Sequence, residues 1–124
     1  MTGIQYPAMV DEHSIAYTPD TLSYTYDSMG RPYTATDTTA SQTLIAGASY
    51  GPANELLSIT GASGGWGGES FAHNSIKQLT CLSTSSSCTS STGVIYNYPS
   101  SANNGKIASQ ADGVSGETVT YTYL

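Results

Sequence analysis

Two histidines and a large number of serines are the residues of this 124-residue chain that could carry out hydrolytic chemistry. His13 and His73 each have an imidazole that could act as a general base for a serine nucleophile. Because serine is so common in this sequence, the presence of both residue types carries little information. We therefore interpret both histidines as ordinary turn or surface residues.

Nine acidic residues could supply the two facing carboxylates that a glycosidase needs. Six of them are scattered through the turns and strand ends that the sequence predicts, which favours a solvated surface role: Asp11, Glu12, Asp27, Glu55, Glu69 and Glu117. The sequence therefore predicts that the protein is not an enzyme.

The sequence also offers few residues that could bind a metal ion or a cofactor. A calcium loop needs several carboxylates close together, and the turn sequence SSANNGK has amide acceptors but no carboxylate. The glycine-rich segment GASGGWGG is not followed by the Lys-Ser/Thr pair or the helix start of a phosphate-binding loop. We predict no metal site and no cofactor.

Cys81 and Cys88 are the two cysteines of the chain, with six residues between them. That spacing suits a hairpin loop closed by a disulfide between neighbouring strands, which is typical of extracellular proteins. The alternative is two independent thiols. A metal site would need more ligands than lie nearby in the sequence.

Trp66 is the single tryptophan, and a Gly-Gly pair flanks it on each side. An indole on such a loop can stack on a sugar ring, or it can fold back and cover an apolar surface. We favour the second interpretation. The aromatic series Tyr26, Tyr50, Phe71 and Tyr98 is likewise interpreted as packing rather than as a ligand platform.

The charge of the chain excludes two classes of partner. The chain has three basic and nine acidic residues. The basic residues, Arg31, Lys77 and Lys106, are too few and too far apart to bind nucleic acid or to form a polybasic patch that binds an anionic membrane. No apolar run approaches the length of a membrane-spanning helix. Residues 1–15 also lack the charged and apolar regions of a signal peptide.

The elements that would position these residues are β-hairpins. In the stretch SYTYDSMGRPYTATD, Tyr24 and Tyr26 project from one face of a strand because side chains alternate with period 2. Asp27 and Ser28 can accept backbone hydrogen bonds at a bend, and Gly30 can take a positive φ. Residues 33–37 then alternate again, as a second strand does.

Further stretches have the same order of aromatic residue, polar turn and apolar strand. The second, ASYGPANELLSIT, has its predicted turn at 51–54, and the third, ESFAHNSIKQLT, turns at 73–75 and continues through Ile76 and Leu79. The fourth, IYNYPSSANNGKIASQAD, turns at 103–105 before Lys106 and Ile107, and the fifth, TVTYTYL, is an opening strand alone. No 3.6-residue periodicity is present, so the chain is predicted to be all-β.

The stretch YTYDSMGRP closely resembles the YD repeat, Tyr-x-Tyr-Asp-x-x-Gly-Arg followed by an apolar residue, which defines the RHS and teneurin-type proteins. The first hairpin has the full signature, in the residues Tyr24, Tyr26, Asp27, Gly30 and Arg31. Pro32 stands where the family usually has leucine. The later stretches resemble degenerate repeats of large bacterial RHS proteins, and the resemblance covers nearly the whole chain.

Side by side, such hairpins would form one curved, twisted and open antiparallel sheet, since a lone hairpin is marginally stable. We expect one repeat region over 1–124, with units at about 1–22 (partial), 23–47, 48–68, 69–93, 94–119 and 120–124 (truncated). One face should carry tyrosine, leucine and isoleucine, and the other mainly serine and threonine. The exposed sheet edges should favour self-association.

The resemblance implies a sheet that spirals into a hollow shell around another polypeptide segment, often a toxic C-terminal domain. Our leading prediction is therefore a non-catalytic structural segment of such a shell, in a secreted or cell-surface parent protein. The alternative is a carbohydrate-binding or adhesion module that uses exposed tyrosines and Trp66. Arg31 is expected to have a structural role, paired with Asp27 or stacked on a tyrosine.

Overall fold

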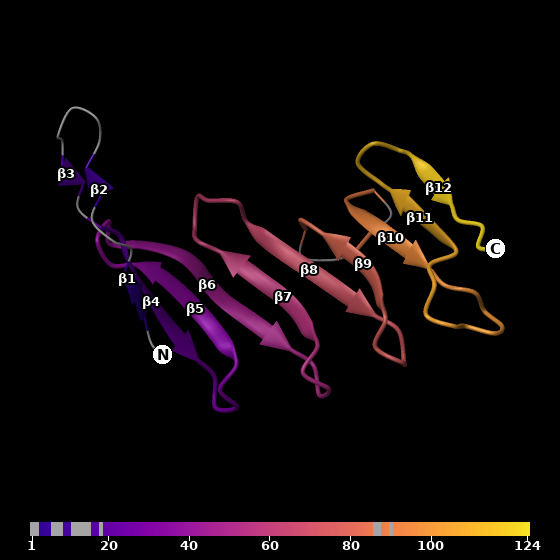
Figure 1. The fold of residues 1–124 in the computed structure, drawn as a ribbon, viewed down its shortest axis with the longest axis horizontal. Coiled ribbons are helices and arrows are strands. Elements are labelled where there is room, and N and C mark those ends of the chain that lie inside the picture. The colour runs from indigo at the N-terminus through magenta and orange to yellow at the C-terminus, as the bar shows by residue number, and fades with distance from the viewer. Residues whose placement is uncertain (1–2, 6–8, 11–15, 18, 86–87, 90) are drawn as a thin grey trace.

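The computed structural model of the chain describes residues 3–5, 9–10, 16–17, 19–85, 88–89 and 91–124. Ten strands of these residues form one antiparallel sheet (Figure 1): β1 (Gly3–Gln5), β4 (Thr21–Tyr26), β5 (Pro32–Asp37), β6 (Gln42–Tyr50), β7 (Leu56–Gly61), β8 (Gly68–His73), β9 (Leu79–Ser83), β10 (Gly93–Asn97), β11 (Ser109–Asp112) and β12 (Thr118–Thr120). Two short strands, β2 (Met9–Val10) and β3 (Ala16–Tyr17), pair with each other apart from this sheet.

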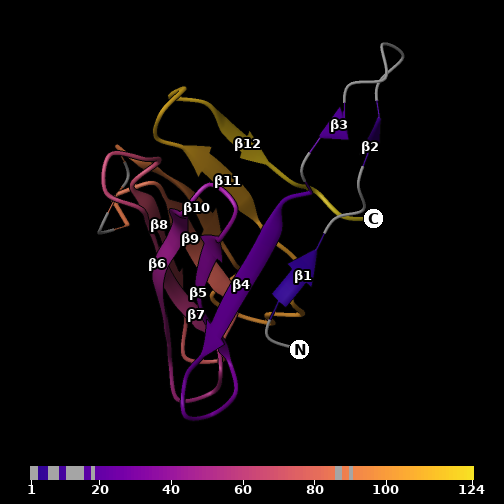
Figure 2. The same cartoon turned by 90° about the vertical axis from the view of Figure 1, so that its left-hand side faces the viewer.

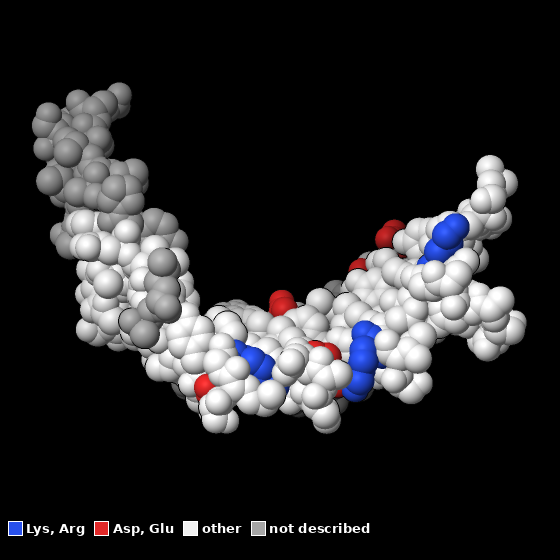
Figure 3. All heavy atoms as spheres, turned by 60° about the horizontal axis from the view of Figure 1, so that its bottom comes forward, with Lys and Arg blue, Asp and Glu red and all other residues white. Residues whose placement is uncertain are grey.

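The order of strands in the large sheet is their order along the chain, β1-β4-β5-β6-β7-β8-β9-β10-β11-β12. The sheet does not close, because β1 and β12 lie at its opposite ends (Figure 1). It is strongly twisted when seen from one end (Figure 2), and the described residues bend into an arc (Figure 3). The prediction of an all-β, open antiparallel sheet is confirmed, and the described residues include no helix.

The connections of this sheet lie alternately on its two long sides. We call the side with the β4–β5, β6–β7, β8–β9 and β10–β11 connections the turn side, and the other the loop side (Figure 1). All three basic residues of the chain, Arg31, Lys77 and Lys106, belong to the turn side, where Figure 3 shows the Lys and Arg atoms in a row. The charged side chains are therefore unevenly divided between the two sides.

The two faces of the sheet differ in polarity, because residues paired across strands point to the same face. The apolar face carries Ile4, Leu22, Tyr24, Ala35, Ile45, Ala48, Ile59, Phe71, Leu82, Val94, Tyr96 and Val119, interrupted by Asp37, Glu69, Gln110 and Asp112. The polar face carries Ser23, Thr25, Thr34, Thr36, Thr43, Ser49, Ser58, Ser70, Ser83, Asn97, Ser109, Thr118 and Thr120, interrupted by Ala72, Cys81, Ile95 and Ala111. This division follows the predicted alternation.

Few side chains are buried, because no second sheet or helix covers either face within the described residues. Ala35 and Cys81 are the buried apolar side chains among them, and Ser83 is the most buried polar one, with 1% of its surface exposed. The apolar face is half-buried by neighbouring side chains alone. The part of the chain that the structure describes thus has one layer over most of its area.

Two predicted elements differ from the structure. His73 ends strand β8 instead of beginning the turn, and Ile76 lies in the turn with 63% of its surface exposed. The β10–β11 connection is longer than its Asn-Asn-Gly signal indicated, so Lys106 and Ile107 precede β11, which begins at Ser109. In both places the extent of the strands depends on the pairing across the whole hairpin and not on one turn-forming residue.

Candidate functional site

The β4–β5 turn is organised by the carboxylate of Asp27. Its Oδ1 accepts hydrogen bonds from the backbone N–H groups of Met29 (2.8 Å) and Arg31 (3.0 Å), and its Oδ2 accepts one from Arg31 Nε (2.7 Å). The backbone N–H of Arg31 is the largest cause of a lowered pKa for the Asp27 carboxyl, and the guanidinium adds to it. Gly30 completes the turn with a φ of 76°. Asp27 and Arg31 are thus used structurally.

Arg31 also joins the first hairpin to the second. Its guanidinium carbon lies 4.5 Å from the ring centroid of Tyr50, and its Nη1 donates a hydrogen bond to Asn54 Oδ1 at 3.2 Å. Both structural roles expected for Arg31, the pair with Asp27 and the stack on a tyrosine, are therefore present at once. A cation over an aromatic ring is favourable by about 0.5–1 kcal/mol at an exposed site.

The β6–β7 and β8–β9 turns have the same backbone path as the β4–β5 turn. The N–H of Asp27 donates to the carbonyl of Arg31 at 2.9 Å, that of Gly51 to Glu55 at 2.8 Å, and that of Asn74 to Gln78 at 3.0 Å. The place of Gly30 is taken by Asn54 (φ 64°) and Lys77 (φ 66°). The strand pairing also shifts register at the same point in all three hairpins.

Different side chains stabilise these three turns in the same way. In the β8–β9 turn, Asn74 Oδ1 accepts from the N–H groups of Ile76 (3.1 Å) and Gln78 (3.0 Å), and Asn74 Nδ2 donates to Gln78 Oε1 at 2.7 Å. In the β6–β7 turn, the carboxylate of Glu55 fills the space that a side chain on Gly51 would need, and accepts from the N–H of Ala53 at 2.8 Å. The Asp-Arg pair is thus replaced by Asn-Gln and by Gly-Glu.

Polar contacts also connect the later turns to one another. Lys77 Nζ lies 2.6 Å from Glu55 Oε1, and this bond from Lys77 is the main cause of a lowered pKa for the Glu55 carboxyl. The side-chain amides of Gln78 and Asn103 exchange two hydrogen bonds, of 3.1 Å and 2.8 Å. Together with Arg31–Asn54, these contacts form a row along the turn side that we call the turn ladder.

Tyrosine hydroxyls make a second set of contacts between successive hairpins. Tyr50 donates to the carbonyl of Pro32 at 2.7 Å, Tyr98 to that of Leu79 at 3.0 Å, and Tyr123 to that of Ile107 at 2.9 Å. In each case the acceptor lies just after the turn of the preceding hairpin. The second hairpin, the fourth hairpin and the segment after β12 are therefore each attached to the preceding hairpin by the same kind of bond.

His73, not Phe71, has the place of Tyr50 and Tyr98 in the third hairpin, since it stands directly before the turn residue Asn74. The aromatic series predicted from the sequence contains Phe71 at this point, two residues before the position that His73 has in the structure. His73 Nδ1 is buried and has no hydrogen-bond partner among the described residues. In the third hairpin, histidine thus stands where the second and fourth hairpins have the tyrosine that donates to the preceding hairpin.

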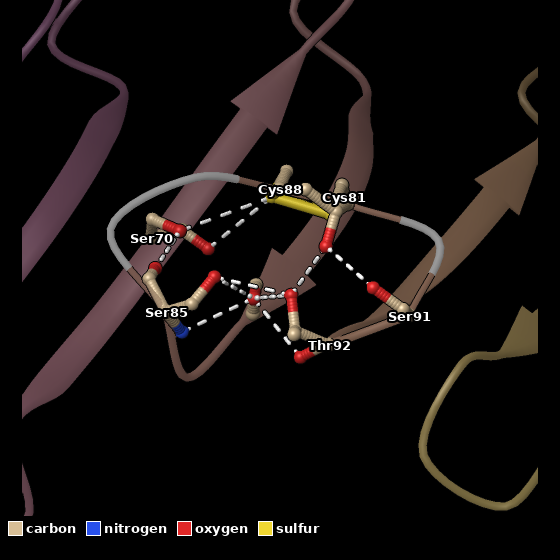
Figure 4. The surroundings of a disulfide bond; sticks show 8 residues. Ser70, Cys81, Ser85, Cys88, Ser91 and Thr92 are labelled. Carbon is tan, nitrogen blue, oxygen red and sulfur yellow. Dashed lines mark hydrogen bonds between the residues drawn. A yellow bond between two sulfur atoms is a disulfide. The ribbon is translucent and has the colours of Figure 1, made fainter.

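Cys81 and Cys88 form a disulfide in the structure (Figure 4). The spacing predicted a bond between neighbouring strands, and this detail is wrong. Cys81 on β9 lies opposite Ile95 of β10, whereas Cys88 lies in the β9–β10 connection. Cys88 Sγ lies 3.7 Å from the carbonyl oxygen of Ser70 on β8. The disulfide therefore holds this connection against the polar face of the sheet.

Hydroxyl groups fix the same connection further. Ser83 Oγ donates to the carbonyl of Thr92 at 2.9 Å, Ser70 Oγ donates to the carbonyl of Ser85 at 2.6 Å, and Ser85 Oγ lies 3.1 Å from Thr92 Oγ1 (Figure 4). Ser83 and Cys81 of β9 are both buried. The serine-rich segment is thus a local second layer over β8 and β9.

Trp66 lies in the β7–β8 connection on the loop side, with 52% of its surface exposed. Its indole packs on the backbone of Gly61, where a Cβ would come within 2.9 Å of Nε1. Because Gly61 is opposite Ile45, this contact is on the apolar face. Trp66 therefore covers the apolar face where β7 ends, while about half of the Trp66 side chain remains accessible to solvent.

An apolar hollow of about 140 Å³ lies on the apolar face near the first two hairpins. Its walls include Tyr24, Ile45, Tyr50, Leu56 and Ile59. It has room for an apolar side chain, but few polar groups that could orient a small ligand. We regard it as a packing surface.

The residues considered for catalysis do not come together in the part of the chain that the structure describes. His13, Asp11 and Glu12 lie outside the described residues. Two segments, 47–51 and 61–65, match the Gly-x-Ser-x-Gly pattern in letters, but neither is followed by the helix that a nucleophile turn requires.

The remaining acidic candidates are bound in turns or stand alone. Asp27 organises the β4–β5 turn, and Glu55 belongs to the turn ladder. Glu69 lies opposite Ile59 on the apolar face, and Glu117 precedes β12. No group of three or more His, Cys, Asp or Glu side chains that could hold a metal ion occurs among the described residues. Nor does any helix in this part of the chain have the length and apolar character to span a membrane.

Asp37 and Asp112 organise two connections on the loop side in a similar way to each other. Asp37 Oδ1 accepts from the N–H groups of Thr39 (2.9 Å) and Ala40 (3.0 Å), and Asp112 Oδ1 accepts from those of Val114 (2.8 Å) and Ser115 (3.2 Å). The N–H of Val114 is the largest cause of a lowered pKa for the Asp112 carboxyl. These carboxylates are turn-forming groups.

A scan against models of known protein families found no match to this chain, and a search of curated proteins found no similar sequence. The resemblance of the first hairpin to the YD repeat therefore stays a prediction from its own residues.

Proposed function

We propose that this chain is a non-catalytic wall segment of an RHS/YD-type shell, in which successive hairpins are repeat units. In this proposal the apolar face covers another polypeptide segment of a secreted or cell-surface parent protein. The full signature in the first hairpin, Tyr24 to Arg31, supports the family. The shared turn path of three hairpins supports the idea that they are related units.

The observation that carries the proposal is the tyrosine contact between successive hairpins. A hydroxyl from Tyr50, Tyr98 and Tyr123 reaches the same backbone position of the hairpin before it. Such contacts fix the position of each hairpin on its neighbour, so that hairpins can be added in one direction. A wall is built in this way, whereas an enzyme or a receptor requires side chains that converge on one place.

The half-exposed apolar face supports the choice of a polypeptide as the covered partner. Ile45, Leu56 and Ile59 line a hollow that has room for an apolar side chain, and no other layer within the described residues covers it. Burying such a surface is favourable by about 25 cal/mol per Å². An extended polypeptide could contribute apolar side chains along the whole arc.

Binding of an unfolded polypeptide tests this proposal. Reduced, carboxymethylated lysozyme is immobilised, and the chain is passed over it in a surface plasmon resonance experiment. Ile59→Lys places a charge in the hollow and should weaken binding at least about tenfold. Thr60→Lys, on the adjacent residue of the other face, should bind like the wild type. Absence of wild-type binding, or equal loss in both variants, would contradict the proposal.

A carbohydrate-binding or adhesion module remains the second candidate, supported by the exposure of Trp66. Four other aromatic side chains among the described residues are exposed, and they lie in two separate places instead of in one stripe: Tyr26 and Tyr33 in the first hairpin, and Tyr121 and Tyr123 after β12. A panel of immobilised oligosaccharides tests this candidate. Binding that Trp66→Ala abolishes would favour it over the wall segment.

A further inference from the structure

The two end strands of the sheet each have one edge without a partner strand among the described residues. Natural proteins usually protect such edges with lysine, other charges or proline. Neither the β1 residues Gly3–Gln5 nor the segment 118–124 contains a charged residue or a proline. Both edges are therefore open to pairing with another strand.

The hydrogen bonds of the neighbouring strands show which backbone groups are free. At β12, the N–H of Asp112 donates to the carbonyl of Glu117, and the N–H of Tyr121 donates to the carbonyl of Ala108. Because the backbone groups of successive residues in a strand point alternately to its two edges, those of Thr118 and Thr120 point away from β11, toward the open edge. At β4, Thr38 N–H donates to Thr21, so Leu22 is bonded toward β1 and pairs with Ile4. The backbone groups of Gly3 and Gln5 therefore point outward.

The directions of the two end strands are also compatible. The sheet has ten strands that alternate in direction, so β1 and β12 run opposite to each other. A second copy placed beyond β12 in the same orientation would thus present its β1 antiparallel to β12. The apolar faces and the turn sides of the two copies would then be continuous.

We propose that β12 of one copy pairs with β1 of a second copy of this chain, in the register Gly3–Thr120, Ile4–Val119 and Gln5–Thr118. The two outer pairs exchange backbone hydrogen bonds, and Ile4 meets Val119 on the apolar face, to which both belong. Because this contact joins different surfaces, it produces open chains of copies and not a closed dimer.

The strand sequences agree with this register. Ile4 and Val119 are 44% and 46% exposed in the single chain, and the contact covers both. A shift by one residue would place Val119 on the apolar face opposite Gly3 or Gln5, whose side-chain positions belong to the polar face. Since each edge offers three described residues, the association is weak and concentration-dependent.

Disulfide cross-linking tests the register. The native cysteines are already joined to each other, so new cysteines at two positions supply the free thiols. Ile4→Cys with Val119→Cys should give a ladder of dimers, trimers and larger species on a non-reducing gel at high protein concentration. The control, Ile4→Cys with Thr120→Cys, places the thiols on opposite faces and should remain mostly monomeric.

Other outcomes of this experiment would overturn the proposal. An equal ladder from both double variants would mean contact without a register. A dimer from Val119→Cys alone, formed as fast as the ladder, would mean that two β12 strands pair with each other. Absence of any cross-link in a chain that retains its far-ultraviolet circular dichroism would mean that the edges do not associate.

A second measurement keeps the wild-type cysteines and uses light scattering. Thr120→Pro removes an outward N–H but no bond to β11, so it should lower the concentration-dependent mass to that of the monomer. Thr120→Val keeps the N–H and should associate like the wild type. Association that survives Thr120→Pro would contradict the proposed edge.

Discussion

Three carboxylates, Asp27, Glu55 and Asp112, accept hydrogen bonds that lower their pKa values below the ordinary values of 3.8 for aspartate and 4.5 for glutamate. In the unfolded chain these groups take up protons at a higher pH than in the folded one. The stabilisation is therefore fully present above about pH 5 and is lost as the pH falls through the lowered pKa values. Urea unfolding from pH 7 to pH 2.5 should show a constant midpoint down to about pH 5 and a decline below it. A midpoint that rises on acidification would contradict this.

The two functions of Asp27 can be separated by substitution. Asp27→Asn keeps the Oδ1 acceptor, as Asn74 does in the third hairpin, and loses the half-buried ion pair with Arg31. Asp27→Ala also removes the acceptor for two backbone N–H groups. We expect the alanine variant to lower the melting temperature clearly more than the asparagine variant. Equal effects would mean that the ion pair, and not the acceptor, stabilises the turn.

His73 offers a stabilising substitution. His73→Tyr would place a hydroxyl where Tyr50, Tyr98 and Tyr123 donate to the preceding hairpin, with the Leu56 carbonyl as its acceptor, and it removes a buried unpaired nitrogen. We expect an increase of about 1 kcal/mol in the free energy of unfolding, measured by urea denaturation. His73→Phe, which lacks the hydroxyl, is the control and should gain less.

At the scale of elements, the β4–β5 turn depends on a positive φ at Gly30. A Cβ at this place would meet no atom within 4 Å, so a substitution changes the backbone strain alone. Gly30→Ala should lower the free energy of unfolding by about 1–2 kcal/mol. Gly30→Asn should cost less, because Asn54 adopts the same conformation in the next hairpin. Denaturant unfolding of the two variants decides this, and an equal loss would contradict it.

The disulfide closes a short loop in the β9–β10 connection, with a sequence separation of 7. In the chain-entropy description a loop of this length stabilises by about 2.5 kcal/mol. Replacing both cysteines by serine should lower the free energy of unfolding by that order. Hydrogen exchange should become faster at Ser83 and Ser85, while the turns near Arg31 and Glu55 remain protected. Faster exchange throughout would mean that the sheet unfolds as one unit.

The hairpins could be predicted because turn residues and period-2 alternation are local signals. Tyr24 to Arg31 indicated both the turn and the Asp27–Arg31 pair. The third hairpin was predicted in the right place, but its turn was predicted one residue early and Phe71 was taken for the aromatic residue before the turn, because the residue there is His73 and not a tyrosine. The replacement of Asp27 by Glu55 in the second turn could not be seen, because it depends on how a side chain folds back over Gly51. The contacts Lys77–Glu55 and Gln78–Asn103 depend on the stacking of hairpins and have no signal in sequence.

At the scale of the whole molecule, the distribution of charge and exposure defines which surfaces remain for partners. The basic residues Arg31 and Lys77 are engaged in the turn ladder, and Lys106 lies 4.6 Å from the ring centroid of Tyr123. Among the described residues, the apolar face is not covered by another layer, and each of the two end strands has one edge without a partner strand. The proposed polypeptide contact and the proposed contact between copies use these two surfaces and do not compete.

The order of strands has a mechanical consequence. Each strand of the sheet contacts only its neighbours in the strand order, and β1 and β12 stand at opposite ends. A force that pulls these ends apart would therefore peel strands away one after another, while the hairpins between them stay intact. Each released hairpin of about 24 residues adds roughly 80 Å of extended chain. The sheet would therefore lengthen under load in small steps, one hairpin at a time, and the central hairpins would unfold last.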